Sequence, residues 1–238
     1  IIFLKIIYKI KTSWDFIIMH VTIKNLLKIN EIVKTNLSKK RKNYIIPKII
    51  AVSKTFKIDH IMPLINHGHL DFGENKVQEA VEKWTEIKKE NNSLKLHLIG
   101  RLQTNKVKIA LKIFDYIHSL DSKKLADKIS NHQEEHKLNT KIFIQVNIGK
   151  EVQKSGISEN ELPDFYNYCK NLNLNILGLM CIPPLNEDST EYFARMQELN
   201  KKIGLEELSM GMSSDYLNAM KYGSTFLRIG SDIFGQRG

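Results

Sequence analysis

A lysine stands at the end of an apolar segment, in the stretch IIPKIIAVSKTF at residues 45–56. The middle of this stretch is apolar and β-branched without alternation, which is typical of a strand buried on both faces. Lys54 follows it directly, at a place where an unpaired charge is costly. A lysine in a partly apolar pocket has a lowered pKa, so its neutral amine can attack an aldehyde. The alternative is a lysine that extends from the strand end into water.

A second group of reactive types lies in FLRIGSDIFG, residues 226–235. Arg228 falls on a predicted strand, and Gly230 and Ser231 form the turn after it. A glycine lets the backbone approach a ligand closely, and the N–H groups that follow can bind an anion. This pattern predicts a phosphate site. The alternative is that Gly230 only makes a turn and Arg228 forms a surface ion pair.

Two serines precede the helical pattern in LSMGMSSDYLNAMKYGST, residues 208–225. Ser213 and Ser214 stand where a serine often caps a helix, and Asp215 falls in the first turn. A serine hydroxyl at this place can equally donate to a phosphate oxygen. Both interpretations stay open on the sequence, and the two serines can share the two roles.

Polar residues follow three further predicted strands, and each of them taken singly is interpreted as a cap or a loop-ordering group. His97 is interpreted in the same way, as a strand histidine with its hydrogen bonds satisfied. These residues are Glu74 and Asn75 after the second strand, Gln103, Asn105 and Lys106 after the third, and Asn147 with Lys154, Ser155 and Gly156 after the fifth.

The chain that must position these residues alternates between strand-like and helical patterns. Alternation predicts a parallel sheet, and eight strands favour one closed (β/α)8 TIM barrel, whose active groups gather at the C-terminal strand ends. An open doubly wound sheet is the alternative, but no GxGxxG follows the first strand. In a barrel the first and eighth strands are neighbours, which would place Lys54 and Arg228 at one rim. We predict strands at 46–53, 70–73, 95–99, 115–119, 141–147, 176–182, 207–211 and 225–229, and helices at 21–37, 75–90, 122–137 and 189–203.

The composition is that of an ordinary globular protein of 238 residues, with 42% hydrophobic and 26% charged residues. A net charge of +10 is compatible with anionic partners, but the lysines are dispersed and form no block, so we predict no nucleic-acid partner. Cys169 and Cys181 fit neither a metal knuckle nor a disulfide framework, which favours reduced thiols in the cytoplasm. We interpret the eight histidines as forming no metal-binding cluster and predict no metal site.

The first residues have a character of their own. Residues 1–18 contain no Met, which first appears at Met19, and lysines interrupt their apolar run too often for a membrane span. We expect residues 1–18 to lie outside the core and one domain to cover residues 19–238. We predict no membrane association. A basic amphipathic targeting helix is the alternative for this segment.

The order AVSKT, DFGENKVQE, HLIGRLQTNK, GLMCIPP, LSMGMSSD and GSTFLRIGSDIFG resembles the YggS/PROSC family of pyridoxal phosphate homeostasis proteins. The resemblance runs from about Ile49 to Gly235. It implies the fold of the alanine racemase barrel domain, preceded by a helix, and pyridoxal 5'-phosphate as the cofactor. It also implies a monomer, with pyridoxal phosphate-requiring apo-enzymes as candidate recipients of the cofactor.

The resemblance assigns roles to six residues. It implies that Lys54 is the Schiff-base lysine, that Arg228 faces the pyridine nitrogen, and that Asn75 lines the pocket. Ser213, Gly230 and Ser231 would hold the phosphate. The family often has threonine where this chain has Ser231, a change that keeps the hydroxyl.

The resemblance implies a cofactor-handling protein without efficient amino-acid turnover. An arginine against the pyridine nitrogen keeps that nitrogen unprotonated, so the ring is a poor electron sink. Related racemases take a tyrosine from an additional β-domain of a partner subunit, and we expect none here, since the sequence ends three residues past Gly235 and Tyr216 and Tyr222 are internal to the barrel. A pyridoxal phosphate-dependent amino-acid racemase and a basic nucleic-acid-binding barrel are the two alternatives.

Overall fold

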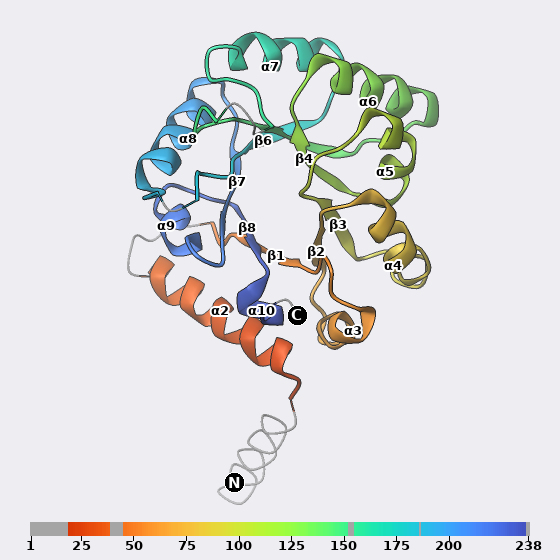
Figure 1. The fold of residues 1–238 in the computed structure, drawn as a ribbon, viewed down its shortest axis with the longest axis vertical. Helices are drawn as coiled ribbons and strands as arrows, with labels where there is room; N and C mark the ends of the chain where they lie inside the picture. The colour runs from red at the N-terminus through yellow and green to blue at the C-terminus, as the bar shows by residue number, and fades with distance from the viewer. Residues whose placement is uncertain (1–18, 39–44, 152–154, 186, 237–238) are drawn as a thin grey trace, which may run out of the picture.

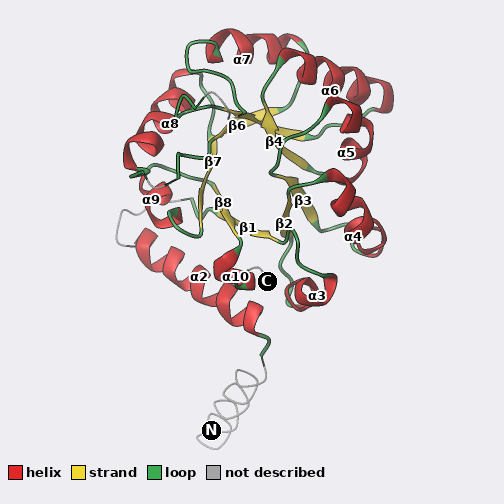
Figure 2. Cartoon of the chain, viewed as in Figure 1, coloured by secondary structure: helices red, strands yellow, loops and turns green. Residues whose placement is uncertain are grey.

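Eight parallel strands form a closed barrel, β1 to β8, in chain order (Figure 1). The structure is a computed structural model that describes residues 19–38, 45–151, 155–185 and 187–236. In Figure 2 the strands form the inner ring and the helices the outer one. The predicted closed barrel is therefore confirmed, and the open doubly wound sheet is excluded.

The elements follow one another as strand and helix along the chain. The strands are β1 (Lys48–Val52), β2 (Asp71–Glu74), β3 (Lys95–Leu98), β4 (Tyr116–Leu120), β5 (Lys141–Gln145), β6 (Ile176–Met180), β7 (Glu207–Met212) and β8 (Phe226–Ile229). The helices are α2 (Val21–Ser38), α3 (Ile58–Asn66), α4 (Val77–Glu90), α5 (Val107–Ile113), α6 (Lys123–His136), α7 (Leu162–Asn171), α8 (Thr190–Lys202), α9 (Tyr216–Lys221) and α10 (Ser231–Phe234), with a 3-10 turn, η1 (Thr104–Lys106).

The predicted strand and helix segments agree with these bounds within two residues at either end. The second strand is shifted by one position, because it includes Glu74, a buried acid that sequence alone favours placing in a loop. The fifth strand ends two residues early, at Gln145, where Val146 pairs with Ile157 in an isolated bridge.

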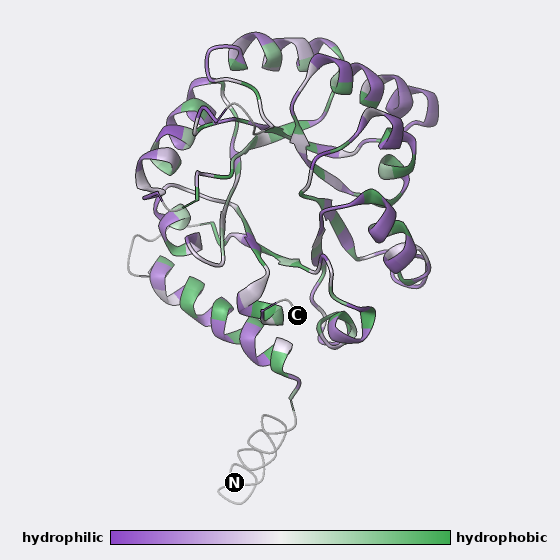
Figure 3. Cartoon of the chain, viewed as in Figure 1, coloured by the Kyte–Doolittle hydropathy of each residue, from purple (hydrophilic) through white to green (hydrophobic). Residues whose placement is uncertain are grey.

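The helix α2 occupies the place in the outer ring that follows the last strand. The helix after β8, α10, has only four residues, and α2 lies against it on the outside of the barrel (Figure 1). Figure 3 shows hydrophobic and hydrophilic residues alternating along α2, and its buried face includes Leu26, Ile29 and Val33. Asn25 Nδ2 also donates a hydrogen bond of 3.0 Å to the carbonyl of Ile233. The predicted N-terminal helix thus completes the barrel; the prediction on residues 1–18 lies outside the described residues.

The inside of the barrel holds a small aromatic-rich core of its own. It consists of Ile50, Val52, Tyr116, Phe143, Met180 and Phe226, each at most 5% exposed. Such interiors are usually filled by branched aliphatic side chains. Here the aromatic rings leave room for polar groups between them, described below. Among the described residues, no helix is both long enough and apolar enough to cross a bilayer.

Candidate functional site

A cavity of about 530 Å³ opens at the C-terminal ends of the strands. It brings together the six residues singled out in the sequence, which come from the ends of the first, second, seventh and eighth strands: Lys54, Asn75, Ser213, Arg228, Gly230 and Ser231. The expectation that Lys54 and Arg228 share one rim is met. The apolar part of the wall is Val52, Phe56, Ile99, Ile182 and Met212, and the remaining lining residues are Ser214, Gly235 and Gln236.

Lys54 is the second residue after Val52, the last residue of β1, and the residue between them, Ser53, is anchored on two sides. Ser53 is fully buried, and its N–H donates to the carbonyl of Gly73 at 3.0 Å. Its hydroxyl donates to Glu74 Oε1 at 2.7 Å, and its carbonyl accepts from Lys83 Nζ at 3.0 Å. The backbone that carries Lys54 is therefore held by side chains of the neighbouring βα unit.

Glu74 is the centre of this support. Its Oε1 accepts hydrogen bonds from Ser53 Oγ, from Lys83 Nζ at 3.0 Å and from Trp84 Nε1 at 3.0 Å. Glu74 is fully buried and the Lys83 side chain is 10% exposed, so this ion pair is largely shielded from water. Glu74 does not line the cavity. Its role is the loop-ordering one expected from the sequence, and the loop it orders is the one carrying Lys54.

The residue after Lys54 has an unusual backbone. Thr55 has φ +70°, a region that β-branched residues rarely adopt and that costs about 1–3 kcal/mol. Its N–H donates to Glu79 Oε1 at 2.5 Å, and the same carboxylate pairs with Lys83 at 3.0 Å. Partial burial acts to raise the pKa of Glu79, but the bonds from Thr55 and Lys83 outweigh it and the pKa lies below its ordinary value.

Arg228 is 3% exposed and lies opposite Ile50 on β1 and Met212 on β7. Its Nη1 donates to Ser209 Oγ and its Nη2 to the carbonyl of Cys181, both at 2.8 Å. The alternative of a surface ion pair is therefore wrong. Burial lowers the pKa of Arg228, yet a guanidinium keeps its proton in proteins. A fixed cation thus lines the cavity floor.

Ser213 joins the ends of β7 and β8. Its Oγ accepts hydrogen bonds from the N–H groups of Gly230 and Asp232, each at 3.3 Å. The residue at the cap of α9 is Asp215, whose Oδ1 accepts from Met212 N–H at 2.6 Å, so the helix-cap interpretation of the serines is wrong. Since Ser213 Oγ accepts two bonds, its own hydrogen can be donated to an anion at the turn.

The protein leaves space for a side chain at Gly230. A Cβ built there would approach no described atom more closely than 3.5 Å, at Val52, and its φ of −114° suits any residue. The protein's own packing thus does not require a glycine at this position. Gly100 differs, because a Cβ there would lie 2.4 Å from Asn75 Oδ1 and 2.3 Å from its carbonyl oxygen. The absence of a side chain at Gly100 therefore leaves the space that Asn75 occupies.

Several residues outside the sequence-based selection complete the site. Phe56 lines the cavity and stacks on Phe234 with ring centroids 5.0 Å apart. Ser209 and the backbone of Cys181 hold Arg228. The sequence signal that could have identified Phe56 as a cavity residue is its apolar character just after a C-terminal strand end. Ser209 could have been identified only from the register of the strands in the barrel.

The other polar strand-end residues that the structure describes are not brought into the cavity. Asn147 orders its own loop, because its amide bonds the N–H and the carbonyl of Glu151 at 3.2 and 2.9 Å. His97 is fully buried and hydrogen-bonded inside the barrel, as expected. Lys154 lies outside the described residues. Of the described residues, Asn147, His97, Gln103, Asn105 and Lys106 do not line the cavity.

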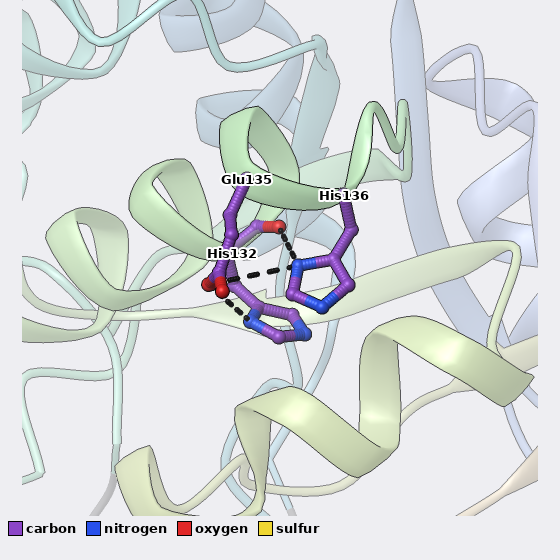
Figure 4. A group of neighbouring side chains, drawn as sticks. All are labelled: His132, Glu135 and His136. Carbon is purple, nitrogen blue, oxygen red and sulfur yellow. Dashed lines mark hydrogen bonds and ion pairs between the residues drawn. The ribbon is translucent and has the colours of Figure 1, made fainter.

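The histidines do form one cluster, contrary to the sequence-based interpretation. His132 and His136 are four residues apart on α6 and lie with Glu135 close enough for their ligand atoms to fall within 4.8 Å of one another (Figure 4). However, His136 Nδ1 bonds the carbonyl of His132 at 3.2 Å. Desolvation is the largest cause that lowers the pKa of His132, and the charges of Lys108 and Lys112, which also lower it, oppose a bound cation. The cluster lies on the outer ring, away from the cavity.

Both cysteines are fully buried free thiols. Burial raises the pKa of each to about 12. A thiol with such a pKa is not a nucleophile near neutral pH. Neither side chain therefore adds reactive chemistry to the cavity.

Comparison with known proteins identifies close relatives of this chain. Residues 31–238 match the family model described as the alanine racemase N-terminal domain. The chain is 36% identical over 224 residues to the pyridoxal phosphate homeostasis protein of Pasteurella multocida, covering 90% of this chain and 96% of that protein. It is 39% identical over 200 residues to the protein of the same name from Aquifex aeolicus, covering 80% and 87% of the two chains.

A solved structure with the same architecture is PipY of Synechococcus elongatus PCC7942, determined with PLP bound. It superposes with a TM-score of 0.74 at 33% sequence identity, and the match covers 84% of this chain and 97% of PipY. The same protein has also been solved without PLP.

Proposed function

The chain belongs to the alanine racemase N-terminal domain family and, within it, to the pyridoxal phosphate homeostasis proteins, and we propose that its barrel-mouth cavity binds pyridoxal 5'-phosphate for intracellular homeostasis of this cofactor. The observation that carries the proposal is the lining of one cavity by an amine, a buried guanidinium and the Ser213–Gly230–Ser231 turn. Relatives that align with most of this chain are named pyridoxal phosphate homeostasis proteins, which supports the proposal.

The donor groups suit such a ligand in kind and in number. Pyridoxal phosphate offers an aldehyde, a pyridine nitrogen and a phosphate, and when bound it supplies reversible condensation with amines. The cavity offers one amine, one guanidinium and a turn with two hydroxyls. The open space beside Gly230 is where a bulkier residue would obstruct an anion held by the backbone.

Each residue has a role that follows from its chemistry. Lys54 Nζ would hold the aldehyde covalently, and Glu74 and Lys83 hold the backbone that carries Lys54. Arg228 would face the pyridine nitrogen as a hydrogen-bond donor without protonating it, because a guanidinium keeps its protons. The Ser213 hydroxyl, the Gly230–Ser231 backbone and the Ser231 hydroxyl bind the phosphate. Asn75 limits the pocket on the side of β2.

We propose binding without efficient amino-acid turnover. Racemisation needs an acid/base on each face of the substrate carbon, and among the described lining residues there is no carboxylate, imidazole, phenol or thiol beside Lys54. The name of the relatives supports the same conclusion. Incubation of the holoprotein with L-alanine or L-serine should give no robust formation of the D-isomer; rapid D-isomer formation would make the racemase alternative correct.

We also propose a reducing compartment, the cytoplasm, because two buried thiols persist unpaired in this fold. Pyridoxal phosphate-requiring apo-enzymes are the proposed recipients of the cofactor.

Absorbance tests the cofactor assignment directly. The purified protein mixed with pyridoxal phosphate should become yellow, borohydride should bleach the band, and peptide mapping should locate the label on Lys54. Lys54→Ala should abolish the band, whereas Lys57→Ala, an exposed lysine three residues away, should keep it. An equal yellow band in Lys54→Ala, or a label on another lysine, would contradict the assignment.

A further inference from the structure

A chain of hydrogen-bonded side chains crosses the interior of the barrel beneath the cavity. It starts at Asp71, the first residue of β2, whose Oδ1 lies 3.1 Å from His97 Nε2. His97 Nδ1 lies 3.0 Å from His118 Nε2, and His118 Nδ1 lies 2.8 Å from Ser209 Oγ. Ser209 Oγ accepts from Arg228 Nη1 at 2.8 Å. The chain thus links five strands, from the N-terminal face of the barrel to the cavity lining.

The direction of the hydrogens in this chain is fixed by simple exclusion. Two neutral imidazoles have one N–H each, and a carboxylate can only accept. If His118 donated from Nδ1 to Ser209, His97 would have to donate from Nδ1 to His118 and would face Asp71 with a bare nitrogen. The assignment that avoids two facing acceptors has Ser209 donating to His118, His118 to His97 and His97 to Asp71. All donors then point away from Arg228.

The charges along the chain agree with this assignment. Burial lowers the pKa of both His97 and His118, so each imidazole is neutral near pH 7. Partial burial acts to raise the pKa of Asp71, but the hydrogen bond from His97 and the charge of Lys48 outweigh it, so the pKa lies below its ordinary value and Asp71 is ionised.

The surroundings of the chain hold its rings in place. His97 stacks on Tyr116 with centroids 4.2 Å apart, and His118 stacks on Phe143 at 4.5 Å. Besides Asp71, two charged groups act on the pKa of His97: Asp115 raises it and Lys48 lowers it. Ring stacking fixes the positions of the two imidazoles but favours neither tautomer. The groups at the two ends, Asp71 and the Arg228-bonded Ser209, therefore determine the direction in which the hydrogens are donated.

Arg228 needs such a connection. Its two side-chain bonds go to neutral oxygens, those of Ser209 and of the Cys181 carbonyl, and no salt bridge joins it to a carboxylate in the described part of the chain. A buried charge is stable only where polar groups are oriented to compensate it. In the assigned direction each dipole of the hydrogen-bond chain turns its negative end toward the guanidinium, and the last acceptor is the Asp71 carboxylate on the opposite face. The carboxylate whose charge acts directly on Arg228 is Asp215.

We propose that Asp71, His97, His118 and Ser209 are positioning residues for Arg228, forming a one-way hydrogen-bond chain that orients its guanidinium toward the ring of the bound ligand. The identity of that ligand rests on the function proposed above. The chain makes the far face of the barrel part of the binding site, although none of Asp71, His97 and His118 lines the cavity.

Nitrogen-15 NMR of the full wild-type chain without ligand tests the direction of the chain. Both His97 and His118 should be neutral Nε2–H tautomers at pH 7, assigned by comparison with the spectra of His97→Gln and His118→Phe. A neutral Nδ1–H tautomer at either position would overturn the proposal. This measurement needs no pyridoxal phosphate, so it decides the chain even if the proposed function is wrong.

Ligand binding tests the consequence for Arg228. Ser209→Ala and Asp71→Asn should each weaken pyridoxal phosphate binding about 10-fold and shift the absorbance band, because a charge-assisted hydrogen bond or its remote anion is lost. Ser209→Thr keeps the hydroxyl and should restore both the affinity and the band. Asp115→Asn is the matched control, since it removes a carboxylate of similar exposure (27% against 21%) that acts on His97 through its charge alone and makes no hydrogen bond to Asp71, His97, His118 or Ser209.

Wild-type affinity and an unshifted band in both Ser209→Ala and Asp71→Asn would refute the proposal. A change of equal size in Asp115→Asn would also refute it, because a general loss of charge or stability would then be the cause. Failure of the wild-type protein to bind pyridoxal phosphate would instead refute the proposed function.

Discussion

Replacing Glu74 by glutamine tests the support of Lys54 with little change of shape. Glu74 is fully buried, and its Oε1 accepts from Ser53, Lys83 and Trp84. An amide oxygen can still accept these bonds, but the negative charge opposite Lys83 is lost. Removing one partner of a buried ion pair costs about 3–5 kcal/mol. Lys83 keeps its second partner, Glu79, so the lower end, about 3 kcal/mol, applies.

That loss of free energy should be visible as a lower unfolding temperature. For a chain of this size 1 kcal/mol corresponds to about 2–4 °C, so Tm should fall by about 6–12 °C in Glu74→Gln. Thermal unfolding followed by circular dichroism measures it. The matched control is Glu86→Gln, which breaks an exposed pair with Lys89 on the same helix and should shift Tm by no more than about 2 °C.

The same substitution should also affect the attachment of an aldehyde at Lys54. Lys83 fixes the carbonyl of Ser53, so a loosened Lys83 should slow borohydride-trapped labelling of Lys54 by pyridoxal phosphate, while Glu86→Gln leaves it unchanged. The reasoning would be refuted if Glu74→Gln and Glu86→Gln had the same Tm and the same labelling rate.

The remaining predictions concern the turns and the interior. Gly230→Ala should leave Tm within about 2 °C, because its Cβ fits against the protein, yet weaken pyridoxal phosphate binding at least about 10-fold by isothermal titration; equal affinity would show that the backbone there does not hold the phosphate. Gly100→Ala should lower stability by about 1–3 kcal/mol in urea unfolding, because its Cβ overlaps Asn75, and an unchanged midpoint would contradict the close approach. Thr55→Gly should raise Tm by a few degrees by relieving a left-handed backbone, and a lower Tm would show that the strain is not real. The free energy of unfolding should also fall as pH drops below about 6.5, because the buried imidazoles have lowered pKa values and the unfolded chain therefore binds more protons. Each buried histidine contributes up to ~1.4 kcal/mol per pH unit. His118→Phe should remove one such contribution, and an unchanged dependence of the unfolding free energy on pH would show that His118 makes none.

The barrel was accessible from the sequence because its strands are short β-branched runs with helical patterns between them. The rim residues were accessible too, since closure makes the first and eighth strands neighbours whatever the loops do. The hydrogen-bond partners of Glu74, in contrast, could not be predicted from the sequence. Its partners Ser53 and Trp84 lie on either side of it in the sequence, and only the fold shows that one oxygen of this buried acid, Oε1, is hydrogen-bonded there.

The interior hydrogen-bond chain could not be predicted for the same reason. His118 and Ser209 are separated by 91 residues, and each alone is an ordinary strand residue. The serine before α9 was ambiguous because a helix cap and a contact across the barrel mouth use the same hydroxyl. In contrast, the pair His132 and His136 was present in the sequence as a spacing of four, and the interpretation of the histidines as unclustered missed it.

The position of α2 against α10 means that this part of the fold can form only late in translation. Its amide contact with the last helix joins residues 208 positions apart, and at about 5–20 residues per second a ribosome needs roughly 10 to 40 seconds between them. Throughout that interval the apolar face of α2 lacks its contact with α10, although α3, which it also contacts, is synthesised early. The glycine–serine turn at residues 230–231 emerges in the same late segment, so the cavity that it lines is complete only when translation is nearly finished.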